Sequence, residues 1–261
     1  MKIKPKKSLG QNFLIDKNIL KKISNIANIT NQNTIVEIGP GKGNLTEFLL
    51  MRNPSKLFVI EKDEKLSILL QNKFKKRIII LNRDILEFED SDIFTCKTVV
   101  FGNLPYNISS QILLKFIINQ NNFKYEKLIF MFQKELAERI IAKVNSKHYG
   151  RLSIISGWKF DVKKIIDIKP SCFQPKPKVE SSLLIFENKK NYDKSFNPAN
   201  LEKITRIFFN QKRKKIKKPL NLIFKNNLDV LKKLNLNQDL RPQNLKPETF
   251  FKITKEFENL I

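Results

Sequence analysis

The residues best suited to chemistry lie in one turn, Asn103-Leu104-Pro105-Tyr106, which follows the apolar run Val99-Val100-Phe101 and a glycine. The Asn103 side-chain oxygen and the Leu104 carbonyl, facing outward before the proline, can accept the two N–H bonds of an exocyclic amine. Tyr106 can stack on the flat ring that carries such an amine. An isolated Asn-x-Pro-Tyr sequence is more often a plain proline turn with a half-buried tyrosine, so the rest of the chain must decide.

Two predicted elements hold this turn in place. The apolar run predicts a buried strand, and the pair Ser109-Ser110 is expected to cap a helix that contains the apolar-periodic segment Gln111–Ile118. Ligands of open α/β sheets bind beyond the carboxyl ends of the strands. We therefore expect a substrate at this turn.

A glycine-rich turn follows another apolar run, Thr34–Ile38. Gly39, Gly41 and Gly43 are three of the seven glycines in the chain, and without a Cβ their backbone can lie close to a ligand. A dinucleotide fingerprint would instead be G-x-G-x-x-G, with a helix N-terminus aimed at a pyrophosphate. The G-x-G-x-G spacing and the nearby acid Glu37 fit a ligand with an amino group and no phosphate better.

Two more acids follow at the ends of the next two predicted strands. Glu61 can accept from both hydroxyls of a ribose, and Asp84 can accept from an adenine amine. Each acid, taken singly, is more often a loop or capping residue. Three successive strands that end in glycines, Glu and Asp together indicate an adenosine ligand without phosphates, namely S-adenosylmethionine.

The chain is strongly basic. It has 50 lysines and arginines against 25 acids in 261 residues, which gives a formal net charge of +25. Such a charge points first to nucleic acid and second to an anionic membrane as the partner. Because Lys far exceeds Arg, a lysine-rich codon bias would produce the same composition, so the charge is only supporting evidence.

Cysteine and histidine are scarce. Cys96, Cys172 and His148 are all that the chain contains, and they allow neither a disulfide framework nor a zinc site, so we expect no metal. The basic N-terminus lacks the apolar segment of a signal peptide, and no apolar run approaches the length of a membrane span. These features predict a cytoplasmic protein without a membrane partner.

From Thr34 onward, predicted strands and helices alternate, which indicates an α/β fold with a parallel sheet and right-handed crossovers. The predicted strands are Thr34–Ile38, Leu57–Glu61, Arg77–Leu81, Thr98–Phe101 and Lys127–Phe132. The predicted helices are Leu45–Met51, Asp63–Lys73, Ser109–Asn119 and Lys134–Val144. Before them, Asp16 is expected to cap a helix that reaches Ile26. The extended runs Lys163–Ile168 and Ser181–Phe186 flank a proline-rich loop and are expected to form an antiparallel hairpin at one end of the sheet.

The character of the chain changes after Asn188. Residues 197–261 show helical periodicity with several proline breaks and contain the basic run Lys212–Lys218. We expect a catalytic domain over 1–190, with an N-terminal arm and helix in 1–30, and a small all-α domain over 191–261. The basic run alone fits a solvated helix face as well as an RNA contact, and Phe208-Phe209 just before it favours RNA.

Seven motifs occur in a fixed order along the chain. They are Ser8–Leu14, Glu37–Gly43, Glu61 with Asp84, Asn103–Tyr106, Tyr149–Ser153, Phe173–Ser181 and Phe209–Lys214. In these motifs, and almost from end to end, the chain resembles the ribosomal RNA adenine N6,N6-dimethyltransferase (KsgA) family. The resemblance implies a Rossmann-like class I S-adenosylmethionine-dependent methyltransferase sheet with a small all-α C-terminal domain.

The resemblance also implies roles for individual residues. Three residues of the N-terminal arm would close over the cofactor: Gln11, Asn12 and Leu14. Further cofactor contacts would come from Gly39, Gly41, Glu61, Asp84 and Asn103. The target adenine would be held by Asn103, Leu104 and Tyr106, with Phe173 packing on its other face. Phosphate contacts are expected from the basic run Lys2–Lys7 and from Lys212, Arg213, Lys214, Lys215, Lys217 and Lys218.

The implied reaction transfers methyl groups from S-adenosylmethionine to N6 of adenosines in small-subunit (16S) rRNA, with a role in ribosome biogenesis. The product would be N6,N6-dimethyladenosine. The sulfonium methyl is already a strong electrophile, so the chemistry requires neither a covalent nucleophile nor a metal. The implied partner is the 30S ribosomal subunit precursor, and we expect a monomer.

Three alternatives remain at this point. The antibiotic-resistance branch of the same superfamily methylates large-subunit RNA and shares the Asn-x-Pro-Tyr motif, although the Ser8–Leu14 and Phe209–Lys214 motifs favour the small-subunit branch. A non-catalytic ribosome-assembly or transcription factor would tolerate loss of the Asn103 or Glu61 side chains, and both are present. DNA adenine methylation lacks support, because nothing outside the Asn-x-Pro-Tyr turn resembles a DNA reader.

Overall fold

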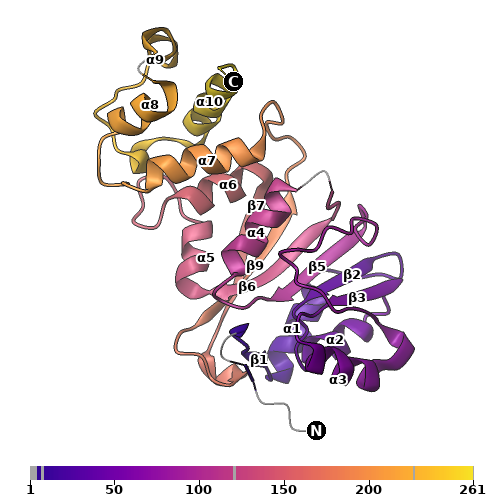
Figure 1. Cartoon of the computed structure of the whole chain (residues 1–261). Coiled ribbons are helices and arrows are strands. Elements are labelled where there is room, and N and C mark those ends of the chain that lie inside the picture. The colour runs from indigo at the N-terminus through magenta and orange to yellow at the C-terminus, as the bar shows by residue number, and fades with distance from the viewer. Residues whose placement is uncertain (1–4, 7–8, 120–121, 226, 261) are drawn as a thin grey trace. The chain divides into compact units, whose positions relative to one another are not determined.

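The structure is a computed structural model that describes residues 5–6, 9–119, 122–225 and 227–260. The chain forms two compact units (Figure 1). The first, called the sheet unit here, contains the residues up to 137 together with 163–188. The second, called the helical unit, contains residues 138–162 together with 189–261.

The sheet has the strand order β4-β3-β2-β5-β6-β9-β7. Neighbouring strands from β4 to β6 are parallel, as the alternation of strands and helices predicted. These strands are β2 (Thr34–Ile38), β3 (Lys56–Ile60), β4 (Ile79–Leu81), β5 (Thr98–Asn103) and β6 (Lys127–Gln133). Their bounds lie within two residues of the predicted ones, because continuous apolar runs mark strands that are buried on both faces.

The register of the strands brings the predicted site residues to one edge of the sheet. Ile38 at the end of β2 lies opposite Ile60 on one side and Gly102 on the other. The residues that follow them, Gly39, Glu61 and Asn103, therefore lie side by side at this edge of the sheet. The strand order reverses between β2 and β5, which is the topological switch point where open α/β sheets bind ligands.

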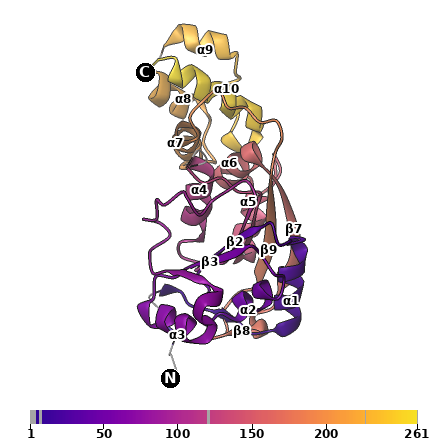
Figure 2. The same ribbon diagram turned by 90° about the vertical axis from the view of Figure 1, so that its right-hand side faces the viewer.

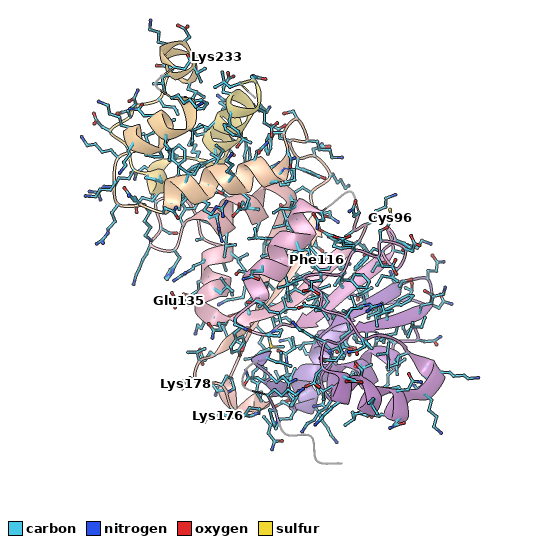
Figure 3. The ribbon with its side chains drawn as sticks, in the orientation of Figure 1. Cys96, Phe116, Glu135, Lys176, Lys178 and Lys233 are labelled. Carbon is cyan, nitrogen blue, oxygen red and sulfur yellow. The ribbon has the colours of Figure 1, made fainter. Side chains whose placement is uncertain are left out.

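Helices connect the parallel strands. They are α2 (Asn44–Leu50), α3 (Glu64–Phe74) with the short 3-10 helix η2 (Lys75–Arg77), and α4 (Ser109–Ile118). Phe116 of α4, labelled in Figure 3, packs against Phe130 of β6, with 5.8 Å between the ring centroids. Both side chains are fully buried, so α4, which follows the Asn103 turn, is packed on β6.

Two helix starts test the capping predictions. Asp16 caps α1 (Lys17–Ile26), as predicted, and its carboxylate accepts from the backbone N–H groups of Asn18 and Ile19. The expected serine cap of α4 was wrong, because the N-cap residue is Ile108 and makes no side-chain hydrogen bond. The Ser109 hydroxyl instead donates to the Tyr106 carbonyl at 3.2 Å, which stabilises the turn before the helix.

The last two strands of the sheet complete one edge. β9 (Ser181–Asn188) lies antiparallel to β6, and β7 (Phe160–Ile168) is the outer neighbour of β9. Six consecutive buried residues in β9 mark it as an inner strand, whereas exposed residues recur along β7. The two extended runs therefore do lie at one end of the sheet, as predicted.

A separate two-stranded sheet was not predicted. It pairs β1 (Phe13–Leu14) with β8 (Phe173–Gln174), which follows the 3-10 helix η3 (Pro170–Cys172). Next to it, the Ile15 amide donates to the Cys172 carbonyl at 2.8 Å, and Figure 2 shows β8 close to α1. Two residues per strand carry too little periodicity to be detected in a sequence.

The helical unit contains α6 (Arg151–Lys159), α7 (Pro198–Phe209), α8 (Lys217–Phe224), α9 (Leu228–Leu234), η4 (Pro242–Asn244) and α10 (Pro247–Glu258). The helix α5 (Lys134–Ile140) begins in the sheet unit and ends in the helical unit. Within the described residues, no helix is long and apolar enough to cross a membrane.

The sequence predicted a single boundary near residue 190, whereas residues 138–162 group with the C-terminal residues. Trp158 of α6 explains this grouping. Its ring packs against Tyr192 and Phe196 at centroid distances of 5.2 and 5.5 Å, and its indole N–H donates to the Asp193 carbonyl at 2.7 Å. The predicted roles of the two domains stay predictions.

Candidate functional site

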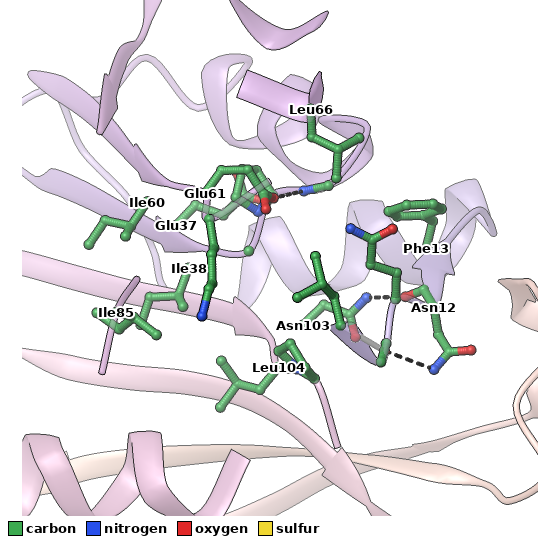
Figure 4. A pocket seen from close by; sticks show the side chains of 18 of the residues that line it. Asn12, Phe13, Glu37, Ile38, Ile60, Glu61, Leu66, Ile85, Asn103 and Leu104 are labelled. Atoms are coloured by element: carbon green, nitrogen blue, oxygen red, sulfur yellow. Dashed lines mark hydrogen bonds between the residues drawn. The ribbon is translucent and has the colours of Figure 1, made fainter. Parts of the chain in front are cut away.

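A pocket of about 270 Å³ opens at the carboxyl ends of β2, β3 and β5 (Figure 4). Five segments contribute most of its lining: residues 9–14, 37–42, 60–62, 83–86 and 103–108. All the predicted cofactor residues are among them, as are Leu104 and Tyr106. The site residues thus come together at the edge of the sheet that the sequence indicated.

The glycine turn serves two purposes. Gly39, Gly41 and Gly43 all have left-handed backbones, with φ of +63°, +60° and +75°. A Cβ on Gly41 would lie 2.6 Å from the Phe13 ring, and one on Gly43 would lie 2.5 Å from Phe74. At Gly39 the nearest atom to such a Cβ would be 4.0 Å away. Close approach of a ligand is therefore a reason for glycine at Gly39, whereas packing of the protein itself requires glycine at the other two positions.

Glu61 holds the glycine turn to the start of α3. Its carboxylate accepts from the Gly41 amide at 3.1 Å and from the Asp63 amide at 2.9 Å. The residue is only 6% exposed, and this burial raises the pKa of Glu61 despite the two amide hydrogen bonds. A carboxylate has about four acceptor sites, so Glu61 retains acceptor capacity for ligand hydroxyls.

Glu37 is buried more deeply. Its carboxyl accepts a 2.6 Å hydrogen bond from the Thr46 hydroxyl of α2, and burial raises the pKa of Glu37 to about 8. The side chain is therefore mostly protonated at neutral pH. A buried, neutral carboxyl does not support the prediction that the acid Glu37 favours a ligand with an amino group.

Asp84 lies at the other side of the pocket and is ion-paired. Lys62 Nζ lies 2.6 Å from one carboxylate oxygen, and the Leu86 amide donates to the other at 2.9 Å. Partial burial alone would raise the pKa of Asp84, but Lys62 and the Leu86 amide outweigh it and hold the pKa below its usual value. Asp84 is thus a charged acceptor, and Lys62 is a neighbour that sequence reasoning missed.

The Asn103 amide has a defined orientation. Its Nδ2 donates to the Asn12 carbonyl at 2.8 Å, which leaves Oδ1 as an acceptor without a donor among the described residues (Figure 4). Tyr106 is half-buried, and its hydroxyl lies 2.6 Å from the Ser181 hydroxyl. Burial raises the pKa of Tyr106, so the phenol stays neutral.

The N-terminal segment forms one wall of the pocket. Gln11 Nε2 donates to Asp63 Oδ2 at 3.1 Å, and Lys6 Nζ lies 2.9 Å from the same oxygen. At the other end of the segment, Asn44 Nδ2 donates to the Leu14 carbonyl at 2.7 Å. Asp63 and Asn44 were missed as functional candidates. The signal that could have identified Asp63 was its place two residues after Glu61, where it caps α3.

Phe173 and the described part of the basic run Lys2–Lys7 do not line the pocket. Phe173 is only 3% exposed and belongs to the hydrophobic core, where it pairs with Leu14 across β1 and β8. In this arrangement its ring is not available to a base in the pocket. Of the basic run Lys2–Lys7 only residues 5 and 6 are described, so the rest of that prediction lies outside the described residues.

The C-terminal basic run is exposed. Exposed side chains are those of Lys212, Arg213, Lys214, Lys215, Lys217 and Lys218. They surround the fully buried Ile216 and lie in a turn and at the start of α8, so the run does not form one helix face. Lys215 is paired with Asp239 at 2.7 Å.

The parallel sheet, its switch point and the glycine turn define the class of protein. They are those of a Rossmann-like class I methyltransferase, and two solved structures share the fold. A dimethyladenosine transferase from Plasmodium falciparum aligns with a TM-score of 0.78 and 28% identity, over 95% of this chain and 98% of that one. The 23S rRNA methyltransferase ErmE aligns with a TM-score of 0.65 and 18% identity, over 94% and 99%.

Sequence comparison identifies the family. The family model for ribosomal RNA adenine dimethylase matches residues 2–259. A protein of Pelagibacter ubique named ribosomal RNA small subunit methyltransferase A is 55% identical over 261 residues, which are 100% of this chain and 99% of that protein. A protein of the same name from Wolbachia pipientis subsp. Culex pipiens is 41% identical over 254 residues, covering 95% and 94%. The chain belongs to the ribosomal RNA adenine dimethylase family.

Proposed function

We propose that the protein transfers methyl groups from S-adenosylmethionine to N6 of adenosines in small-subunit (16S) rRNA and forms N6,N6-dimethyladenosine. The observation that carries this proposal is the Asn103–Tyr106 turn, which faces the same pocket as the glycine turn, with the amide of Asn103 oriented by the Asn12 carbonyl. The family and the relatives named small subunit methyltransferase A support the choice of reaction and of RNA.

The pocket residues fit an adenosine with a short amino-acid chain. The open side of Gly39 leaves room for a ligand against the backbone, and the Glu61 carboxylate retains acceptor sites for ribose hydroxyls. Asp84 stays charged and can accept from an adenine amine. Gln11, Asn12 and Leu14 would cover this ligand from the N-terminal segment. When bound there, S-adenosylmethionine supplies an electrophilic methyl group.

The chain's own task is to make the adenine amine reactive. The N6 lone pair is delocalised into the ring, so acceptors must hold N6 in place and favour a pyramidal nitrogen. Asn103 Oδ1 and the Leu104 carbonyl would accept the two N6 hydrogens and stabilise the positive charge that develops on N6. After one methyl transfer a single N–H remains, and a second transfer is chemically allowed if the pocket admits the added bulk.

The target base must leave its stack to reach the pocket, and stacking on Tyr106 would offset part of this cost. The predicted partner on the other face, Phe173, would have to leave the core to make such a contact. Tyr106 thus has better structural support than Phe173. After transfer, the proton can leave from the charged product to water.

The predicted domains keep separate roles in this proposal. The domain over 1–190 binds the cofactor and the base, and the domain over 191–261 binds RNA or the 30S ribosomal subunit precursor. The exposed run from Lys212 to Lys218 would contact phosphates, which position RNA without reading its sequence. We propose that the protein acts as a monomer in the cytoplasm, during ribosome biogenesis.

The decisive experiment uses tritiated S-adenosylmethionine and small ribosomal subunits from cells that lack this activity. Purified protein is added, and the RNA nucleosides are separated after digestion. We expect label in N6,N6-dimethyladenosine of the small-subunit RNA. Label confined to large-subunit RNA would move the protein to the resistance branch, and tight subunit binding without label would favour an assembly factor.

A further inference from the structure

One buried residue next to the pocket, Asp63, has no role in the proposed chemistry. Asp63 is 2% exposed and follows Glu61 by two residues, yet it does not belong to the pocket lining. We infer that Asp63 is a positioning residue that ties the N-terminal segment to the Glu61 carboxylate and thereby sets the affinity for the cofactor. This inference rests on the proposed function.

The two carboxylate oxygens of Asp63 have different hydrogen-bond partners. Oδ1 accepts from the Lys65 amide at 3.1 Å and caps α3. Oδ2 accepts from Gln11 Nε2 at 3.1 Å and lies 2.9 Å from Lys6 Nζ. One carboxylate therefore joins a helix start to two residues of the N-terminal segment. Burial alone would raise the pKa of Asp63, but Lys6 and Gln11 hold it below its usual value, so the group is charged.

The backbone amide of Asp63 contacts the Glu61 carboxylate. Its amide donates to Glu61 Oε1 at 2.9 Å, while Glu61 Oε2 accepts from the Gly41 amide. A continuous series of hydrogen bonds thus runs from the glycine turn through Glu61 and Asp63 to Gln11. The two walls of the pocket that these residues form are connected through Asp63.

The Gln11 side chain is held at both ends. Its Oε1 accepts from the Lys6 amide at 2.8 Å, and its Nε2 donates to Asp63. Further anchors of the segment lie later along the chain, at Asn12 with Asn103, at Leu14 with Asn44 and in the pairing of β1 with β8. Removal of the Asp63 hydrogen bonds would therefore free the part of the wall that contains Gln11, while the Asn103 end stays attached.

The substitution Asp63→Asn tests the roles of the two carboxylate oxygens separately. Asn is as good a helix N-cap as Asp, so the cap of α3 is retained through Oδ1. The amide nitrogen that replaces Oδ2 is a donor and would meet two other donors, those of Lys6 and Gln11. The variant thus breaks the contacts to the N-terminal segment and keeps the fold.

We expect Asp63→Asn to raise the dissociation constant for S-adenosylmethionine about tenfold, measured by titration calorimetry on the full chain. The KM for the cofactor should rise by a similar factor, while kcat at saturating cofactor changes less than about twofold. With the cofactor present, amide hydrogen exchange at residues 9–14 should be faster in Asp63→Asn than in the wild-type protein. A purely structural role would lower the melting temperature without this split between KM and kcat.

Lys6→Met tests the same contact from the other side. Because Lys6 is exposed, loss of its ion pair should lower the cofactor affinity by about two- to fivefold. The matched control is Lys163→Met, which removes another exposed lysine with a partner, Glu187 at 3.0 Å, and should leave the affinity unchanged. If Asp63→Asn does not fold, Lys6→Met alone carries the test.

The outcomes separate this inference from the proposed function. Wild-type protein that does not bind S-adenosylmethionine would overturn both. Wild-type protein that binds it, together with equal affinity in Asp63→Asn and Lys6→Met, would overturn only the role of Asp63.

Discussion

The glycine turn offers a test of how the structure divides packing from ligand binding. Gly39 and Gly41 have the same left-handed backbone, so an alanine should cost about 1–2 kcal/mol of conformational strain at either position. At Gly41 the new Cβ would also overlap the Phe13 ring at 2.6 Å, and overpacking of this kind costs about 1–3 kcal/mol. At Gly39 nothing lies closer than 4.0 Å.

Gly41→Ala should therefore be less stable than Gly39→Ala by about 1–3 kcal/mol in the free energy of unfolding. At about 2–4 °C per kcal/mol for a chain of this size, the melting temperatures should differ by about 2–12 °C. Gly39→Ala should instead lose cofactor affinity by more than about tenfold, because its Cβ occupies the open side of the turn.

The assay combines chemical denaturation with titration calorimetry. Far-UV circular dichroism follows both units, whereas fluorescence of Trp158, the single tryptophan, reports on the helical unit. The matched control is Gly157→Ala in α6, where a Cβ meets nothing within 4 Å. This control should be stabilised by about 0.5–1 kcal/mol, because alanine is the better helix former.

Equal stabilities for Gly39→Ala and Gly41→Ala would refute the assignment of Phe13 as the reason for glycine at position 41. Unchanged cofactor affinity in a folded Gly39→Ala protein would refute the assignment of the open side to the ligand.

Three further predictions concern chemistry, RNA and pH. Asn103→Ala should lower kcat by about 10²–10³-fold in single-turnover assays, because it removes an acceptor that stabilises the developing charge on N6. The circular dichroism spectrum and RNA binding of this variant should stay normal. Near-normal turnover would contradict the proposed mechanism. Replacement of Lys214, Lys215, Lys217 and Lys218 by glutamine should weaken RNA binding and lower the slope of log K against log salt by roughly 0.7–0.9 for each phosphate that is no longer neutralised. Arginine at the same four positions, which keeps the charge, should preserve both, and an unchanged slope in the glutamine variant would exclude the run from the RNA interface. The Glu37 carboxyl keeps its proton up to pH about 8 in the folded chain but releases it near pH 4.5 when unfolded, so stability should fall as pH rises between these values. Glu37→Gln should flatten this fall in urea denaturation, and an identical pH dependence of stability in the wild type and in Glu37→Gln would contradict the raised pKa of Glu37.

Local signals were sufficient to predict the sheet. The runs Thr34–Ile38 and Lys127–Phe132 are largely apolar, and buried parallel strands need no other pattern. The glycine turn, Glu61 and the Asn103–Tyr106 turn each follow such a run directly. Their meeting at one edge could thus be predicted, because parallel strands bring their carboxyl ends together.

The sequence did not predict which partner each side chain would choose. Asp63 looks like an ordinary helix cap in the sequence, and its contacts to Lys6 and Gln11 span 57 and 52 residues. Phe173 looked available to a base, yet pairing of β1 with β8 places it in the core. Residues 138–162 joined the helical unit because the aromatic partners of Trp158 lie beyond residue 190.

Periodicity and turn chemistry depend on neighbours within a few residues, so they can be read from the chain alone and define the strands, the turns and the kind of ligand. The pKa of Glu37, the orientation of the Asn103 amide and the anchoring of the N-terminal segment depend on groups distant in sequence. Burial and long-range hydrogen bonds set these properties, and they exist only once the chain has folded.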